Sequence, residues 1–142
     1  MGEGLLKKDK ALFPLRLSRG ALADRAVPVI NPGEIEAWPV WEIRAPVRGF
    51  QFSSPDGQAF GITAPADGSD AVAAGRVLTV DTRPGRKTLT DNTGRNYWPL
   101  LDKSPSLWPV EEGKTTVGIR ITAGSNGPAS LKLTLRPRYE TY

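Results

Sequence analysis

The sequence predicts an all-β protein, an antiparallel β-sandwich with very little helix. Its 142 residues include 15 glycines and 13 prolines, which fall at short intervals between brief runs of alternating apolar and polar residues. Such runs, separated by turn residues every 8 to 12 positions or so, are typical of sandwiches and barrels. On this basis we expect about eight or nine strands.

The alternation is clearest near the end of the chain. In residues 115–122 and again in residues 131–135 every second side chain is apolar, which predicts strands that each bury one face. Residues 124–128 read GSNGP, a sequence typical of tight turns, so we predict that the two strands form a hairpin. The predicted buried positions are Val117, Ile119, Ile121, Leu131, Leu133 and Leu135.

Two further hairpins are predicted in the middle of the chain. Residues 48–53 and 58–63 flank the turn sequence SPDG, and residues 76–82 and 87–91 flank the sequence RPGR. The core candidates of the second hairpin are Leu78, Val80 and Leu89.

The RPGR segment fits a type II turn, in which Pro84 fixes φ and Gly85 accepts a positive φ. Because the twist of that turn opposes the twist of the strands, a two-residue hairpin suits it poorly, and we expect a wider loop. Asp81 precedes the turn and has Arg83 or Lys87 as a partner for an exposed ion pair.

The remaining segments are less regular. Residues 91–94 read DNTG and are predicted to turn the chain into a strand over residues 95–101. Residues 38–45 form another predicted strand, whose start or edge is marked by Pro39. Residues 102–112 contain two prolines and are predicted to form a long loop with one helical turn near residues 106–108.

The length of the chain predicts a single domain, since domains cluster near about 100 to 150 residues. We assign residues 26–142 to the β-sandwich. Residues 1–25 are assigned to an N-terminal arm or linker, because their weak apolar period fits neither a helix nor a strand.

The composition removes several classes of active site. With no cysteine and no histidine, the chain has no disulfide, no Cys or His metal ligand and no Ser-His or Cys-His pair. Paired carboxylates are the main remaining option for hydrolysis, and their spacing selects no pair. We therefore predict no enzyme: no catalytic residue, no metal site and no cofactor. The carboxylates considered are Glu34, Glu36, Glu42, Asp81, Asp102, Glu111 and Glu112.

The net charge of +4 is spread along the whole chain. A nucleic-acid surface needs a clustered basic stripe, so the sequence favours a solvated surface and makes nucleic acid an unlikely partner. The apolar runs are only a few residues long, so we expect a soluble protein without membrane insertion.

The four tryptophans have two interpretations. Trp38, Trp41, Trp98 and Trp108 are candidates for an aromatic platform that binds sugar rings, or for packing in the core and at interfaces. Three of them precede a proline, which places them at element boundaries and favours packing. The candidate interface or ligand contacts are Trp38, Trp41, Arg83, Arg86, Trp98 and Trp108.

Six short motifs follow one another along the chain. They are VPVINPG at 27–33, AWPVWEIRAP at 37–46, LTVDTRPGRK at 78–87, DKSPS at 102–106, WPVEEGK at 108–114 and LRPRY at 135–139. The order of these motifs resembles the C-terminal domain of siphophage distal tail proteins. The resemblance covers about residues 26–140, and the order and spacing are more specific than any single motif.

The resemblance implies a galectin-like or jelly-roll-like β-sandwich in a virion structural protein of the phage tail. Proteins of that family form rings, commonly hexamers, at the tail tip, where they join the tail tube to the hub that carries receptor-binding or wall-degrading proteins. They also carry an N-terminal belt domain, of which residues 1–25 would be a remnant, an arm or a trimmed end.

We therefore expect a non-enzymatic assembly module of a phage or phage-derived tail tip, assembled in the host cytoplasm and then part of the virion. Its expected partners are copies of itself and other tail proteins of the tube, the hub and the tape-measure assembly. The alternative is a carbohydrate-binding module that recognises host cell-surface glycan through tryptophan and tyrosine faces.

Overall fold

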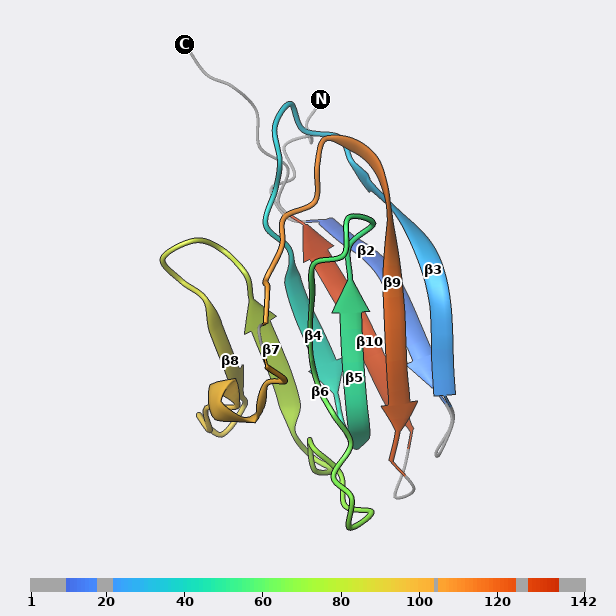
Figure 1. Cartoon of the computed structure of the whole chain (residues 1–142), viewed down its shortest axis with the longest axis vertical. Helices are drawn as coiled ribbons and strands as arrows, with labels where there is room; N and C mark the ends of the chain where they lie inside the picture. Colours follow the sequence, from blue (N-terminus) through green and yellow to red (C-terminus); the bar gives the residue numbers. More distant parts are fainter. Residues whose placement is uncertain (1–9, 18–21, 104, 125–127, 136–142) are drawn as a thin grey trace.

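The computed structural model describes residues 10–17, 22–103, 105–124 and 128–135. The chain forms two antiparallel sheets that pack face to face (Figure 1), one with the strand order β2-β10-β4-β7-β8 and the other with the order β3-β9-β5-β6. The strands are β2 (Lys10–Leu17), β3 (Leu22–Asn31), β4 (Val40–Arg44), β5 (Val47–Ser53), β6 (Ala59–Ile62), β7 (Val77–Asp81), β8 (Thr88–Asp91), β9 (Gly113–Ala123) and β10 (Ala129–Leu135).

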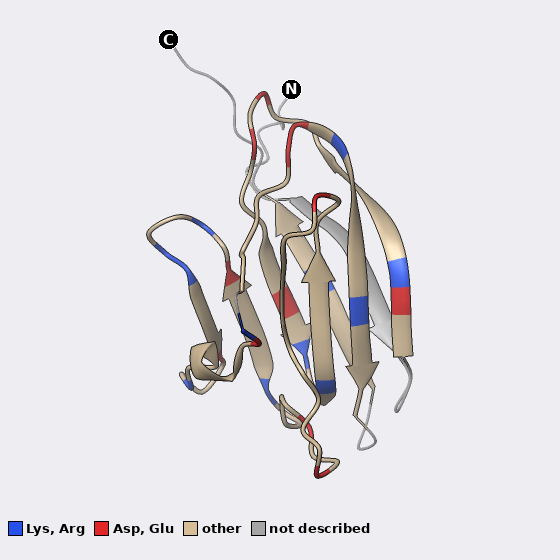
Figure 2. Ribbon diagram, viewed as in Figure 1, with Lys and Arg blue, Asp and Glu red and all other residues tan. Residues whose placement is uncertain are grey.

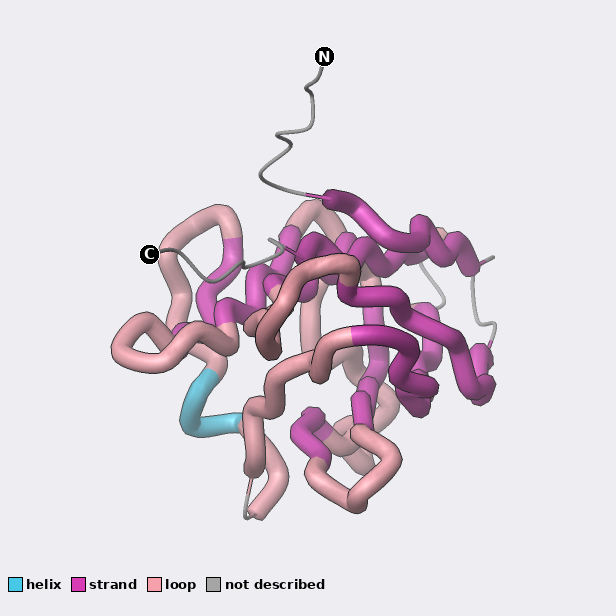
Figure 3. The backbone as a smooth tube through the Cα atoms, turned by 90° about the horizontal axis from the view of Figure 1, so that it is seen from above, coloured by secondary structure: helices cyan, strands magenta, loops and turns pink. Residues whose placement is uncertain are grey.

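Helix is confined, in these described ranges, to one 3₁₀ turn, η1 (Trp98–Leu100), as the view in Figure 3 also shows. The predicted all-β sandwich with very little helix is therefore confirmed. The strand over residues 38–45 is also confirmed, and β4 begins directly after Pro39, as expected for a residue that cannot donate to a ladder.

The core lies between the sheets and follows the alternation of the sequence. All nine predicted core positions are at most 1% exposed: Leu78, Val80, Leu89, Val117, Ile119, Ile121, Leu131, Leu133 and Leu135. Aromatic rings join the two layers, since Trp41 of β4 stacks on Phe52 of β5 with ring centroids 4.4 Å apart. Alternation therefore identified the buried face of each of these strands.

The predicted hairpin of the last two strands is wrong. β9 pairs with β3 on one side and β5 on the other, and β10 lies between β2 and β4 in the opposite sheet. Both strands are thus central, and neither has a free edge for the other. Residues 124–128, where the hairpin turn was predicted, stand between β9 and β10, and residues 125–127 lie outside the described part.

The two middle hairpins are confirmed. β5 and β6 pair across the SPDG turn, in which the Gly57 amide donates to the Ser54 carbonyl at 3.1 Å. β7 and β8 pair across a loop in which the Arg86 amide donates to the Arg83 carbonyl at 2.9 Å. Gly85 has a φ of +77°, which fits the predicted type II turn, and the loop is wider than two residues, as expected.

The strand predicted over residues 95–101 does not form. After the turn at 91–94, the chain makes one isolated bridge at Asn96, buries Tyr97 completely and enters η1. The physical reason is local, because the Arg95 amide donates to the Asp91 side chain at 3.1 Å. The predicted helical turn is also misplaced, because it lies at residues 98–100. In the described part of the predicted loop, residues 105–109 have no regular secondary structure and Val110 forms an isolated bridge with Ala37.

The prediction of an arm or linker over residues 1–25 is wrong for the residues of this range that the structure describes, because they belong to strands of the two sheets. β2 pairs with β10 and belongs to the five-stranded sheet, while β3 begins at Leu22 and pairs with β9 over its whole length. The predicted boundary after Arg25 falls inside β3. This edge strand escaped detection because its exposed residues include Leu22 and Ile30, which obscures the alternation.

Candidate functional site

The six predicted contact residues separate into three groups. Trp41 and Trp108 are in the core, with 0% and 1% of their surface exposed. Trp98 lies on η1, beyond the end of β8, and is 39% exposed. The structure brings together the remaining three, Trp38, Arg83 and Arg86, around the loop between β7 and β8.

The buried tryptophans have structural roles. The Trp41 ring lies 5.8 Å from the Trp108 ring in an edge-to-face arrangement, and the other face of Trp41 stacks on Phe52. The Trp108 indole N–H donates to the Phe52 carbonyl at 3.4 Å. Both rings are almost completely buried, so the packing interpretation holds for these two residues.

The loop between β7 and β8 is anchored to the segment before β4. Thr82 is completely buried, and its hydroxyl donates to the Pro39 carbonyl at 2.6 Å. This bond holds the first residue of the loop against the residue that follows Trp38. The first residue of the loop is therefore fixed to the segment before β4.

Arg83 is fixed by the acid that precedes the turn. Its Nε and Nη2 atoms donate to the Asp81 carboxylate at 2.9 and 2.6 Å, which confirms the ion pair anticipated from the sequence. Burial alone would raise the pKa of Asp81, but the hydrogen bonds and the charge of Arg83 outweigh it and hold that pKa below its ordinary value.

The outer part of the loop is basic and lies beside an aromatic ring. The Lys87 ammonium group is 5.8 Å from the centroid of the Trp38 ring, within the range of a cation–π contact. Arg86 and Lys87 are exposed, whereas Trp38 and Arg83 are half-buried. We call Trp38, Arg83, Arg86 and Lys87 the basic loop surface; Figure 2 shows the basic residues on this loop.

The basic loop surface has the chemistry of a protein interface. Arginine and tryptophan are enriched in such interfaces, and exposed charges orient a partner as it approaches. Three cavities in the described part of the chain are all lined by other residues. The surface is thus suited to contact another surface more than to enclose a small molecule.

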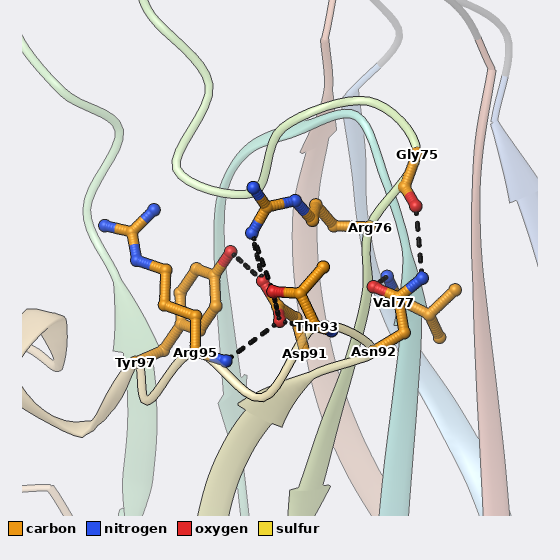
Figure 4. A network of polar contacts seen from close by, with 8 residues as sticks. All are labelled: Gly75, Arg76, Val77, Asp91, Asn92, Thr93, Arg95 and Tyr97. Carbon is orange, nitrogen blue, oxygen red and sulfur yellow. Dashed lines mark hydrogen bonds and ion pairs between the residues drawn. The ribbon is translucent and has the colours of Figure 1, made fainter.

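Sequence reasoning missed a second polar cluster, centred on the buried carboxylate of Asp91 (Figure 4). Arg76 and the Tyr97 hydroxyl both donate to Oδ2 of Asp91, at 2.6 and 2.9 Å. The amide and hydroxyl of Thr93 donate to Oδ1, at 2.8 and 2.6 Å. The DNTG sequence signalled the local turn, but nothing in it signalled the contacts with Arg76 or Tyr97.

Electrostatics in this cluster favour the ionised carboxylate. Burial would raise the pKa of Asp91, but the donors of Thr93, Arg76 and Tyr97 together lower it well below its ordinary value. In return, burial and the bond to Asp91 raise the pKa of Tyr97. The bonds to Asp91 join the residue before β7, the turn after β8 and the residue before η1, so we interpret this cluster as structural.

In the described ranges, no group of three or more acidic residues lies close enough to hold a metal ion. In the same part of the chain, no helix has both the length and the apolar character needed to cross a membrane. Comparison with known proteins gives no match to this chain among family models, curated proteins or solved structures.

Proposed function

We propose that this protein is a non-enzymatic structural component of a phage or phage-derived tail tip. In this role it assembles with copies of itself into a ring, for which a hexamer is the first candidate. The ring joins the tail tube to the hub or receptor-binding apparatus. The protein would be assembled in the host cytoplasm and would then be part of the virion.

Two observations support this proposal. The order of the motifs between residues 26 and 140 resembles the C-terminal domain of distal tail proteins. A β-sandwich is the fold that this resemblance implies, although the fold alone is compatible with many roles.

The basic loop surface carries the assembly part of the proposal. It presents Arg86 and Lys87 on a loop that is anchored through Thr82 and braced by the Asp81–Arg83 pair. Such preorganisation lowers the entropy lost when a partner binds. Arg83 acts here as a positioning residue, and Trp38, Arg86 and Lys87 are the proposed contacts.

The arrangement of the tryptophans gives less support to a sugar platform. Trp41 and Trp108 are buried, and the other two lie at different ends of β8: Trp38 contacts Lys87 just before the strand, and Trp98 follows its end in η1. Figure 1 shows η1 and the β7–β8 loop at opposite ends of β8. The four rings therefore do not form one continuous face.

Native mass spectrometry of the purified chain, with electron microscopy of the same sample, tests this proposal. A ring-shaped particle of a defined number of subunits, formed without added sugar, supports it. Because exposed charges are screened by salt, the proportion of rings should fall between about 50 and 500 mM salt. A chain that stays monomeric at all concentrations and salt levels would contradict the proposal.

A further inference from the structure

A shallow groove lies on the outer face of the four-stranded sheet, away from the basic loop surface. It has a volume of about 310 Å³ and is lined by parts of β5, β6 and β9 and by the loop that contains Asp102. The volume is at the lower end of the range for small-molecule sites, and suits a ligand of about one ring. Its polar lining side chains are Gln51, Thr63, Asp102, Arg120 and Thr122.

Among the described residues that line this groove, Arg120 has the one basic side chain. It stands on β9 between Ile119 and Ile121, both of which point into the core, so its own side chain faces outward. Asp24 and Gln51 are its neighbours on the two adjacent strands. No group in the described part of the chain forms a hydrogen bond or ion pair with the Arg120 guanidinium, Asp24 included, so its five donors remain available.

Backbone forms the part of the groove at Gly49, two residues before Gln51 on β5, and Gly61, opposite Gln51 on β6, lines an adjoining pocket. A Cβ atom at Gly49 would lie 2.7 Å from the Ala64 amide nitrogen, and one at Gly61 would lie 2.2 Å from the Phe50 carbonyl oxygen. Both positions therefore accept only glycine without a shift of the backbone. No side chain rises into the groove from Gly49, which lies opposite Thr122 of β9.

Asp102 supplies a fixed acceptor to the same groove. Its Oδ1 atom accepts bonds from the amide and hydroxyl of Thr63, at 3.0 and 2.8 Å, and its own amide donates to the Gly61 carbonyl at 2.9 Å. The carboxylate is thus held in place, with Oδ2 open to a further donor. A bare anion would be repelled by this carboxylate, whereas hydroxyl groups would bind to it.

We propose that this groove binds an anionic saccharide, a sugar ring that carries a carboxylate or a phosphate. Arg120 binds the anion through two parallel N–H donors, the geometry that both groups accept. The amide of Gln51, the hydroxyl of Thr122 and Oδ2 of Asp102 bind the hydroxyl groups of the ring. This inference goes beyond the proposed function, because assembly of the protein ring does not require a sugar and binding of the sugar does not require assembly.

Calorimetric titration of the full chain tests the proposal with four probes. They are an oligosaccharide of glucuronic acid, glucose 6-phosphate, a neutral glucose oligosaccharide of matched length, and inorganic phosphate. At least one of the two charged sugars should bind at least tenfold more tightly than the neutral sugar and than inorganic phosphate. The comparison of the two charged sugars identifies the anion.

Variants then identify the residues. Arg120→Ala should weaken binding of the preferred sugar at least tenfold, Arg120→Lys should weaken it less, and Gln51→Ala should weaken it several-fold. Arg44→Ala removes an exposed arginine from the other sheet and should leave binding unchanged. Circular dichroism checks that each variant is folded.

Three results would overturn the inference: equal binding of charged and neutral sugars, no binding of either charged sugar at millimolar concentration, or a folded Arg120→Ala variant that binds like the wild type. Because the titration does not depend on assembly, its failure leaves the ring measurement unaffected. A failure to form rings likewise leaves the titration interpretable.

Discussion

Arg76 and Asp91 lie next to each other where the adjacent strands β7 and β8 begin and end. Nη1 of Arg76 donates a 2.6 Å hydrogen bond to Oδ2 of Asp91. Arg76 directly precedes β7, and Asp91 is the last residue of β8, so the bond holds the two strands together at the end opposite their loop. The same carboxylate also binds the buried Tyr97 hydroxyl, which attaches the segment before η1.

We predict that Asp91→Ala markedly lowers the melting temperature. It leaves Arg76, Thr93 and Tyr97 without their common acceptor, and a buried donor without an acceptor is costly. Asp67→Ala is the matched control, because Asp67 accepts the amide and hydroxyl of Ser69 in a similar but exposed turn. Melting curves by circular dichroism should show a much smaller change for the control, and equal changes would contradict the role given to Asp91.

Acid should destabilise the protein, and Asp91 should contribute to this effect. The folded-state pKa of Asp91 is lowered, so its stabilising contribution is present above the unfolded pKa of about 3.9 and is lost as the pH falls below that value. The pKa values of Asp56, Asp67 and Asp81 are lowered as well, so the Asp91→Asn variant keeps part of the dependence. Urea midpoints between pH 7 and pH 2 should fall less steeply for the variant than for the wild type, and parallel curves would show that Asp91 does not contribute.

The two classes of tryptophan should differ in their effect on stability. Trp41→Ala removes a completely buried ring that touches both sheets, and should reduce the free energy of unfolding by about 3 to 5 kcal/mol. Trp98→Ala alters a partly exposed ring on η1 and should cost less than about 1 kcal/mol. Urea denaturation measures both, and similar losses would show that Trp98 packs far more than its exposure indicates.

The hydrogen bond from the Thr82 hydroxyl to the Pro39 carbonyl should contribute measurably to the free energy of unfolding. Thr82→Val keeps the shape of the side chain but removes the buried hydroxyl that donates to the Pro39 carbonyl, and should cost about 1 kcal/mol. Thr88→Val, at an exposed position of β8, is the control and should be nearly neutral. If both variants unfold at the same urea concentration, the bond from Thr82 does not stabilise the loop.

Features of the fold that depend on residues close in the sequence could be predicted, whereas those that depend on residues far apart could not. Alternation is local, and it placed residues such as Ile119 and Leu133 in the core. It says which face of a strand is buried but not which strand lies beside it, and so β9 and β10 were paired wrongly. The edge strand β3 was missed because Leu22 and Ile30 are apolar and exposed.

The same distinction applies to the candidate sites. In β4, Trp41 and Ile43 alternate with the charged residues Glu42 and Arg44. The burial of Trp41 could therefore be predicted from the sequence. The polar cluster of Asp91 was not, because Arg76 is 15 residues away in the sequence. The groove around Arg120 was likewise hidden, since it is assembled from three strands and a loop.

The most direct test of the proposed role compares assembly of the wild type with that of an Arg86→Ala, Lys87→Ala double variant. These two residues are exposed, and their removal leaves the Asp81–Arg83 pair and the Thr82 anchor intact, so the variant should fold normally. As a control, an Arg44→Ala, Lys132→Ala variant removes the same charge from β4 and β10 of the five-stranded sheet, outside the basic loop surface. By native mass spectrometry at low salt, the wild type and the control should form rings while the Arg86, Lys87 variant remains monomeric; rings of the variant equal in abundance to those of the wild type would contradict the assembly role of the basic loop surface.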